Sequence, residues 1–467
     1  MVIIMFFSPR NLIEKEGKFV FNDTVSAVAN KCLCKDIFPE LWFNHTYRQS
    51  ALIIKETDEL IFKIGDASIP DTKGELYAIS ISESGICVKS ETQKGLINGF
   101  MTLIDRILIE DFDWGASAYV DACEILDSPK FENRMIHYCI FPDTDIKKFI
   151  RLIKLTAILK YSHIILEFWG TIKFDAMKEL AWESGYSKEE IRPIIELAKD
   201  LGLEVIPMFN HWGHASASRI IYGKHVVLDQ NPALQTYFSD DGWCWAIEKP
   251  KVRELLKSIR EELCELFGDG NYFHIGCDEA YNFKFTKENQ DMICDYINSL
   301  ADELASLGRR TIIWGDMFVS VNNKKFVVEN DYIGSSPDEE TQNHMLNRLD
   351  KKIVIADWQY NTENYPVESA VMFKNAGLDT LICPWDRSVK VSDACIKTLK
   401  EDGLFGLIHT TWSTLDMGMP YVGRTACCCW DKEVSSNTDI LFYATRTAAV
   451  LRKAGFAEGS FEDAGWY

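Results

Sequence analysis

From about residue 130 onward, this 467-residue chain repeats one pattern: a short apolar segment, an amphipathic segment, and a glycine. In one unit, Ser187 and Glu190 form a capping box, apolar residues follow at helical spacing, and Gly202 precedes the next apolar run. The repeats predict strands that start near Met135, His163, Leu203, Tyr272, Thr311, Ile353, Thr380 and Phe405. Eight strand–helix units predict an α/β fold, a (β/α)8 TIM barrel over residues 126–467. A doubly wound open sheet is the alternative, but its G-x-G-x-x-G fingerprint does not occur in the sequence.

Residues 1–125 have a different rhythm. Residues 76–82 alternate between apolar and polar, Gly85 makes a turn, and residues 86–90 return, which predicts a hairpin. Residues 95–108 have one apolar face at helical spacing, and residues 2–7 are expected to form a strand. We therefore expect a small α+β domain ahead of the barrel.

The composition narrows the classes of partner. Fifty basic against 70 acidic residues give a net charge of −20, which disfavours nucleic acid and anionic membranes as partners.

The apolar start is too short for a secretory signal, and no run is long enough for a membrane helix. The 14 cysteines are scattered, as free thiols are in a reducing compartment. We therefore expect a cytoplasmic protein. Adjacent thiols rarely converge on one ion, so the Cys427–Cys429 run does not predict a metal site.

Two adjacent carboxylates, Asp278 and Glu279, follow the apolar strand at Tyr272. Acids placed there are costly to desolvate unless partners or function compensate, although a solvated loop pair is the simpler reading. In a barrel, the functional side chains lie at the C-terminal ends of the strands. Five of the predicted ends carry tryptophan, whose face packs against sugar rings. His211 and His214 are spaced like a metal pair, but a third ligand at a recognisable spacing is missing from the sequence.

The segment His274–Glu279, His-Ile-Gly-Cys-Asp-Glu, resembles the His-x-Gly-Gly-Asp-Glu signature of the family 20 glycoside hydrolases, the β-N-acetylhexosaminidases. Cys277 replaces the usual second glycine, as in the hexosaminidase D-like branch. Residues 127–135 are similar to the family's Asp-x-Pro-x-Phe-x-x-Arg-Gly segment, and residues 207–214 resemble its third-strand segment. The resemblance covers residues 70–467 and implies the same architecture of a small domain followed by a barrel.

The resemblance also implies roles for individual residues. Glu279 would be the general acid and base, and Asp278 would orient the substrate's acetamido group, whose carbonyl is the nucleophile. His214 would contact Glu279, and an acid from the second strand, here Glu167 in place of the usual Asp, would orient His214. The family's Tyr-x-Asp is replaced by Pro-Trp385-Asp386, so Tyr360 becomes the candidate donor to the acetamido oxygen. The remaining substrate-binding candidates, which would contact sugar hydroxyls or wall the ring, are Arg134, Trp314, Trp358, Trp385, Asp386 and Trp412.

The expected function is therefore that of an exo-acting, retaining β-N-acetylhexosaminidase that works by substrate-assisted catalysis without a cofactor or metal. Its partner would be a carbohydrate with a terminal N-acetylhexosamine. The sequence leaves open whether that sugar is GlcNAc or GalNAc, and a homodimer is one assembly state that it permits. Two alternatives remain: a barrel glycosidase that uses two protein carboxylates on another sugar, and a catalytically inactive carbohydrate-binding barrel.

Overall fold

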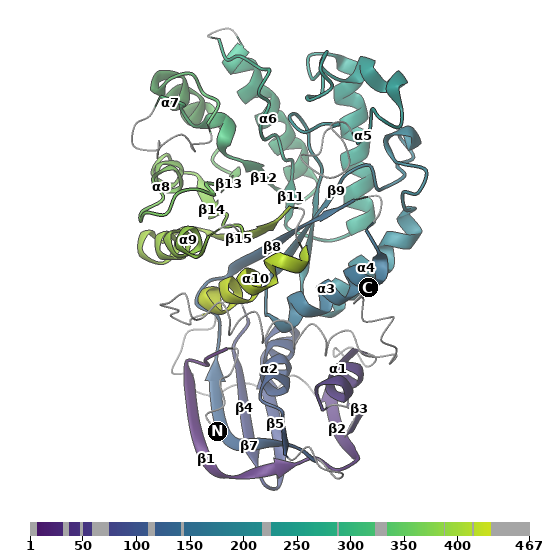
Figure 1. Cartoon of the computed structure of the whole chain (residues 1–467), viewed down its shortest axis with the longest axis vertical. Helices are drawn as coiled ribbons and strands as arrows, with labels where there is room; N and C mark the ends of the chain where they lie inside the picture. Colours follow the sequence, from purple (N-terminus) through teal and green to yellow (C-terminus); the bar gives the residue numbers. More distant parts are fainter. Residues whose placement is uncertain are drawn as a thin grey trace.

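The chain folds into a small domain followed by a closed barrel, shown in Figure 1 with the small domain at the bottom. The computed structural model describes residues 7–30, 37–46, 50–57, 74–110, 117–141, 144–216, 226–286, 289–322, 334–386, 388–412 and 415–430. The strand expected at residues 2–7 lies outside this part, apart from Phe7. Within the described residues, every helix is too short or too polar to cross a membrane.

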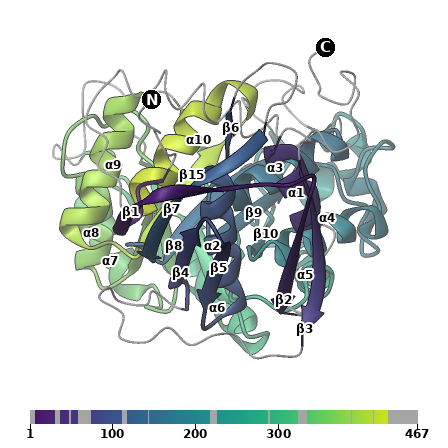
Figure 2. The same cartoon turned by 90° about the horizontal axis from the view of Figure 1, so that it is seen from below.

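The small domain is built on an antiparallel sheet with the strand order β1-β7-β4-β5, and β6 also pairs with β7. The predicted hairpin is confirmed as β4 and β5, and the predicted helix is confirmed as α2, which lies across both strands (Figure 2). A separate parallel pair, β2 and β3, lies beside α1. The elements are β1 (Asn11–Val20), β2 (Thr24–Asn30), α1 (Ile37–His45), β3 (Ala51–Thr57), β4 (Tyr77–Ser82), β5 (Gly85–Ser90), α2 (Gln93–Asp105), β6 (Leu108–Glu110) and β7 (Ser117–Asp127).

Eight parallel strands close the barrel, which confirms the predicted fold class and every predicted strand. The ring is completed by β15, which pairs with β8 along six residues. The strands are β8 (Asn133–Ile140), β9 (His163–Phe168), β10 (Glu204–Met208), β11 (Tyr272–His274), β12 (Arg310–Trp314), β13 (Val354–Asp357), β14 (Asp379–Ile382) and β15 (Gly406–Thr411).

Helices surround the barrel in the same alternating order. In α4 the capping box forms as expected: the Ser187 hydroxyl accepts the Glu190 N–H, and the Glu190 carboxylate accepts the Ser187 N–H. Gly202 follows with a φ of 76°, a left-handed conformation that favours glycine. The helices are α3 (Ile146–Ile158), α4 (Lys188–Asp200), α5 (Pro250–Phe267), α6 (Asn289–Ser306), α7 (Glu339–Arg348), α8 (Glu368–Asn375), α9 (Val389–Asp402) and α10 (Leu415–Trp430). Short 3-10 turns occur at η1 (Lys178–Leu180), η2 (Pro232–Tyr237) and η3 (Asp316–Phe318).

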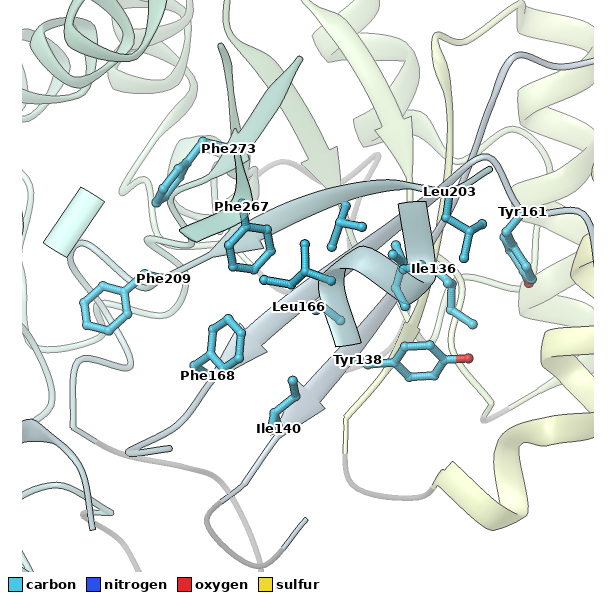
Figure 3. Close-up of a cluster of buried hydrophobic side chains, with 14 of the residues drawn as sticks. Ile136, Tyr138, Ile140, Tyr161, Leu166, Phe168, Leu203, Phe209, Phe267 and Phe273 are labelled. Atoms are coloured by element: carbon cyan, nitrogen blue, oxygen red, sulfur yellow. The ribbon is translucent and has the colours of Figure 1, made fainter. Parts of the chain in front are cut away.

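Strand alternation gives the barrel two cores. One set of side chains, including Met135, Ile165 and Ile312, fills the interior and ends in a group of tryptophans. The other set, such as Ile136, Tyr138 and Ile140 of β8, packs outward against the helices (Figure 3). Because successive strand residues point to opposite faces, the parity of a residue on β8 decides which core it joins.

A buried charged layer joins the two domains. The Arg134 guanidinium donates to both carboxylate oxygens of Glu75, at 3.0 and 2.8 Å, and burial would raise the pKa of Glu75, but Arg134 and Lys94 lower it to about 2. Lys160 donates to the Tyr77 hydroxyl at 3.0 Å. Since Arg134 lies at the start of β8 and Lys160 precedes β9, the N-terminal ends of these strands face the small domain. The C-terminal ends therefore open on the far side.

The pKa of Lys160 is lowered by burial to about 8. The folded state disfavours the protonated form of Lys160, and this lowers the free energy of unfolding. The loss is complete below about pH 8, and it disappears as the pH rises toward the pKa of about 10.4 that lysine has in the unfolded chain. We predict that the free energy of unfolding of wild type rises by about 1 to 3 kcal/mol relative to that of Lys160→Met between about pH 7.5 and 9.5. Denaturant unfolding at several pH values measures this difference.

The comparison must be differential because burial raises the pKa of thiols such as Cys383, which weakens both proteins at high pH. Lys257→Met, at an exposed position of α5, is the matched control, and its difference from wild type should stay constant. A constant difference for Lys160→Met as well would contradict the prediction.

Candidate active site

The loop that follows β11 has an unusual backbone. Gly276, Cys277 and Glu279 have φ values of 64°, 74° and 51°, in the left-handed region that side chains disfavour by roughly 1–2 kcal/mol per residue. A Cβ on Gly276 would lie 1.7 Å from the Asn210 Oδ1, so only glycine fits there. Of the four non-glycine residues with positive φ in the described chain, three are in or beside this loop: Cys277, Glu279 and His214. Strain of this kind persists only where the surrounding structure holds the backbone in place, and it is commonest at active sites and ligand-binding sites.

The two carboxylates meet one histidine. The His214 Nε2 lies 2.8 Å from the Glu279 Oε2 and 3.7 Å from the Asp278 Oδ2. All three side chains are at least 95% buried, and they come from the loops after β10 and β11. Gly213 permits the approach, because a Cβ there would lie 1.8 Å from the Asp278 carbonyl oxygen. The arrangement places the Glu279 carboxyl against the His214 imidazole, so that a proton can be exchanged away from bulk water.

Asp316, at the end of β12, fixes the backbone of this pair. Its Oδ2 accepts the Glu279 N–H at 2.8 Å, and its Oδ1 accepts the Trp358 Nε1–H at 3.2 Å. One carboxylate thus ties the candidate acid to a candidate wall of the sugar site. The sequence gives no sign of this linking position.

Glu167 has other partners than the resemblance implies. Its Oε2 lies 2.9 Å from the His137 Nε2 and accepts the Cys139 thiol at 3.3 Å, while its Oε1 accepts the Asn210 amide at 2.7 Å. Burial would raise the pKa of Glu167, but the neighbouring His137 and the hydrogen bond from Cys139 hold it below the usual value. Glu167 therefore orients His137, and the expected orientation of His214 by Glu167 is not what the structure has.

Five aromatic residues lie close together at the C-terminal end of the barrel. The Trp412 Nε1 donates to the Tyr360 hydroxyl at 2.9 Å, and that hydroxyl also lies 2.9 Å from the Thr410 Oγ1. The rings of Trp358 and Trp385 each lie 5.1 Å from Tyr360. Trp314 lies 5.7 Å from Trp412. The structure thus brings Trp314, Trp358, Tyr360, Trp385 and Trp412 into one aromatic wall, with Asp386 half-buried next to Trp385 in sequence.

Arg134 is the candidate that the structure removes from the site. It is the second residue of β8, at the opposite end of the barrel, and it donates to Glu75 and to backbone carbonyls such as that of Lys160. The physical reason is strand parity: Met135 belongs to the interior core, so its neighbour Arg134 must point outward. The predicted contact of Arg134 with sugar hydroxyls is corrected accordingly.

Two groups of donor atoms lie close enough to hold a metal ion: His137, Cys139 and Glu167, and His214, Asp278 and Glu279. Hydrogen bonds of Glu167 to His137 and Cys139 hold the first group together, and the contact between His214 and Glu279 joins two members of the second. The His-x-x-His pair does not converge, since the His211 ring lies against Phe209 and Phe273, 5.9 Å from each. Burial lowers the pKa of His211 well below its usual value, as expected of a neutral core histidine.

Sequence reasoning missed Trp243. It lies between η2 and α5, far from any predicted strand end, yet its ring is 4.6 Å from His214. Its Nε1 donates to the Glu279 carbonyl at 2.6 Å. His137 was also missed, although its alternation with Met135 on a barrel strand was a usable signal that it points inward.

Comparison with known proteins identifies the family of the chain. The family model described as glycosyl hydrolase family 20, catalytic domain, matches residues 158–394. The chain is 23% identical over 351 residues to a β-hexosaminidase of Porphyromonas gingivalis, covering 66% of this chain and 45% of that one. It is 22% identical over 325 residues to a lacto-N-biosidase of Bifidobacterium bifidum, covering 64% and 28%. This chain therefore spans less than half the length of either relative.

A solved structure has the same fold. It is a family 20 exo-β-N-acetylglucosaminidase from Vibrio harveyi in complex with N-acetylglucosamine. The TM-score is 0.68 at 17% sequence identity, over 97% of this chain and 77% of that chain.

Proposed function

The chain belongs to glycosyl hydrolase family 20, and from that membership we propose that it is an exo-acting β-N-acetylhexosaminidase. It would release terminal N-acetylhexosamine from glycosides with retention of configuration. The observation that carries the proposal is the buried contact of 2.8 Å between the His214 Nε2 and the Glu279 Oε2, with Asp278 beside it. A general acid of this reaction must exchange a proton at a reaction centre shielded from bulk water, and this buried contact between a carboxyl and an imidazole suits that role.

In the proposed reaction, the carbonyl oxygen of the substrate's acetamido group attacks the anomeric carbon as the glycosidic bond breaks. Glu279 gives its proton to the departing oxygen, and an oxazolinium-like intermediate forms. Glu279 then takes a proton from water, and that water opens the intermediate. His214, whose Nε2 lies 2.8 Å from the Glu279 Oε2, would hold the Glu279 carboxyl in place through both steps.

Asp278 would accept the acetamido N–H and stabilise the positive charge that develops on the nitrogen. Tyr360 would donate to the acetamido oxygen; its hydroxyl is already positioned by Trp412 and Thr410. Trp314, Trp358 and Trp412 would enclose the acetamido methyl group and the ring, because their apolar faces line one end of the barrel interior. This arrangement requires a 2-acetamido group on the substrate.

The test is a side-by-side assay of the p-nitrophenyl β-glycosides of GlcNAc, GalNAc and glucose. We expect release of nitrophenol from at least one N-acetylhexosaminide and none above background from the glucoside, which has a hydroxyl in place of the nucleophile. Comparable rates on the glucoside would replace the proposal with the two-carboxylate alternative. Inactivity on all three, with sugar binding retained, would support the inactive barrel.

A cytoplasmic, reducing location is a further part of the proposal. It is supported by the twelve cysteines in the described part of the chain, all of which are free thiols. Titration of denatured, freshly purified protein should count nearly all 14 cysteines as thiols. A count lowered by several pairs would contradict this location.

A further inference from the structure

Three inward-facing side chains meet near the C-terminal ends of β8 and β9. Cys139 and Glu167 are directly paired in the register of the two strands, and His137 precedes Cys139 by two residues. Because side chains alternate between the two faces of a strand, all three point into the barrel, as Met135 and Ile165 do. We call these three residues the His137–Cys139–Glu167 cluster.

The donor atoms of the cluster are spaced like the ligands of one metal ion. The His137 Nε2 lies 2.9 Å from the Glu167 Oε2, and the Cys139 Sγ lies 3.3 Å from that oxygen and 3.9 Å from that nitrogen. Zinc bonds of about 2.0 to 2.3 Å at tetrahedral angles place neighbouring ligand atoms about 3.3 to 3.6 Å apart. Shifts of about half an ångström would therefore bring the three atoms onto one ion.

The chemistry of the cluster favours zinc. An imidazole nitrogen, a thiolate sulfur and a carboxylate oxygen are all zinc ligands, whereas Mg²⁺ and Ca²⁺ prefer oxygen alone. Hydrogen bonding gives little reason for a cysteine beside a buried carboxylate, because a thiol is a weak donor. The other oxygen of Glu167 accepts the Asn210 amide at 2.7 Å, which is the outer hydrogen bond that a metal-bound carboxylate normally has.

The surroundings of His137 suit an ion that binds reversibly. Within the described part of the chain, its second ring nitrogen, Nδ1, is buried without a hydrogen-bond partner. A metal-bound histidine normally donates through that nitrogen, and such an outer partner contributes about 10- to 100-fold to metal affinity. The cluster therefore holds zinc less tightly than a structural zinc site does, and its three protein ligands leave a fourth position for water.

The cluster borders the proposed sugar site. The His137 ring lies 4.8 Å from Trp412 and 6.0 Å from Trp314. We propose that the His137–Cys139–Glu167 cluster is a binding site for Zn²⁺, and that zinc bound there competes with the sugar. The Cys139 thiol passes its proton to solvent as the zinc–sulfur bond forms. The metal site stands on its own geometry, whereas the competition rests on the proposed function.

The binding experiment uses Co²⁺ as a probe, because a thiolate bound to Co²⁺ gives a charge-transfer absorption band. Titration of metal-free wild type should saturate this band at about one Co²⁺ per chain, and Zn²⁺ should remove it. Cys139→Ser keeps a hydroxyl beside Glu167 and should lose the band, with an affinity for Zn²⁺ lowered by more than about tenfold. Cys383→Ser, which removes another buried thiol of the barrel interior, is the matched control and should keep the band.

A second variant and a kinetic readout complete the test. His137→Gln leaves every thiol in place and should weaken Co²⁺ binding by more than about tenfold, so the site is tested even if Cys139→Ser does not fold. In wild type, Zn²⁺ should raise KM for a p-nitrophenyl N-acetylhexosaminide without changing kcat. Cys139→Ser should need more than about ten times as much Zn²⁺ for the same effect.

The outcomes separate the claims. A missing band in wild type, or a band that survives in Cys139→Ser, would refute the site. Equal inhibition of wild type and Cys139→Ser by Zn²⁺ would mean that the inhibitory ion binds elsewhere, and it would refute the competition. If folded wild type cleaves no N-acetylhexosaminide, the proposed function and the competition both fail, while the Co²⁺ spectrum still decides whether the site exists.

Discussion

Replacing Glu279 with glutamine is expected to lower kcat by about 10² to 10⁴-fold on substrates with a poor leaving group. The amide keeps the shape of the side chain and can still contact His214, but it has no proton to give. The loss should shrink for dinitrophenyl glycosides, whose leaving oxygen departs without protonation. Kinetics on a series of aryl N-acetylglucosaminides with decreasing leaving-group pKa measure this trend.

Glu265→Gln, an exposed carboxylate on α5, is the matched control and should behave as wild type. Circular dichroism and Tm would establish that Glu279→Gln is folded, because removing the charge from a buried pair also affects stability. A loss that is equally large for every leaving group would show that Glu279 does not act as the acid.

Asp278→Asn should lose about 10² to 10³-fold in kcat, by a different route. It removes the charge that faces the acetamido nitrogen, and the intermediate carries the same positive charge whatever group has left. The loss should therefore persist across the same aryl series. A thiazoline that mimics the cyclic intermediate should inhibit wild type strongly and Asp278→Asn weakly.

Asp269→Asn, outside the site after α5, controls for the loss of one negative charge. If Asp278→Asn and Glu279→Gln respond alike to leaving-group acidity, and the thiazoline inhibits neither them nor wild type, then the division of labour between the two acids is wrong. A retaining mechanism with a protein nucleophile would then be the better account.

The barrel could be predicted because the pattern of apolar strand, amphipathic helix and glycine recurs along the chain, and in one unit both ends of the helix are marked in the sequence. Capping at Ser187 and the left-handed glycine at Gly202 mark where α4 begins and ends, and the apolar run after Gly202 is short enough to indicate a buried strand. The loop after β11 could be located for a related reason. Its Gly-Cys-Asp-Glu run places two acids directly after a core strand, which is unusual for a purely structural loop. The structure adds that the backbone of this loop is strained, as is common at functional sites.

The partners of the site residues could not be predicted, because they depend on tertiary geometry. Arg134 fits a family segment, yet one residue of strand parity sends it to Glu75 in the small domain. Glu167 stands where an acid was expected, but its longer side chain bonds to His137 on the neighbouring strand. Trp243 reaches His214 from a loop with no periodic pattern, so nothing in the local sequence indicated its position.

The central claim is that the substrate's own acetamido group is the nucleophile. It is tested most directly with p-nitrophenyl glycosides whose N-acetyl group carries one, two or three fluorine atoms. Fluorine withdraws electrons from the attacking carbonyl, so kcat/KM of the wild-type protein should fall with each fluorine, by more than about tenfold over the series. A kcat/KM that stays level from the acetyl to the trifluoroacetyl substrate would contradict the claim.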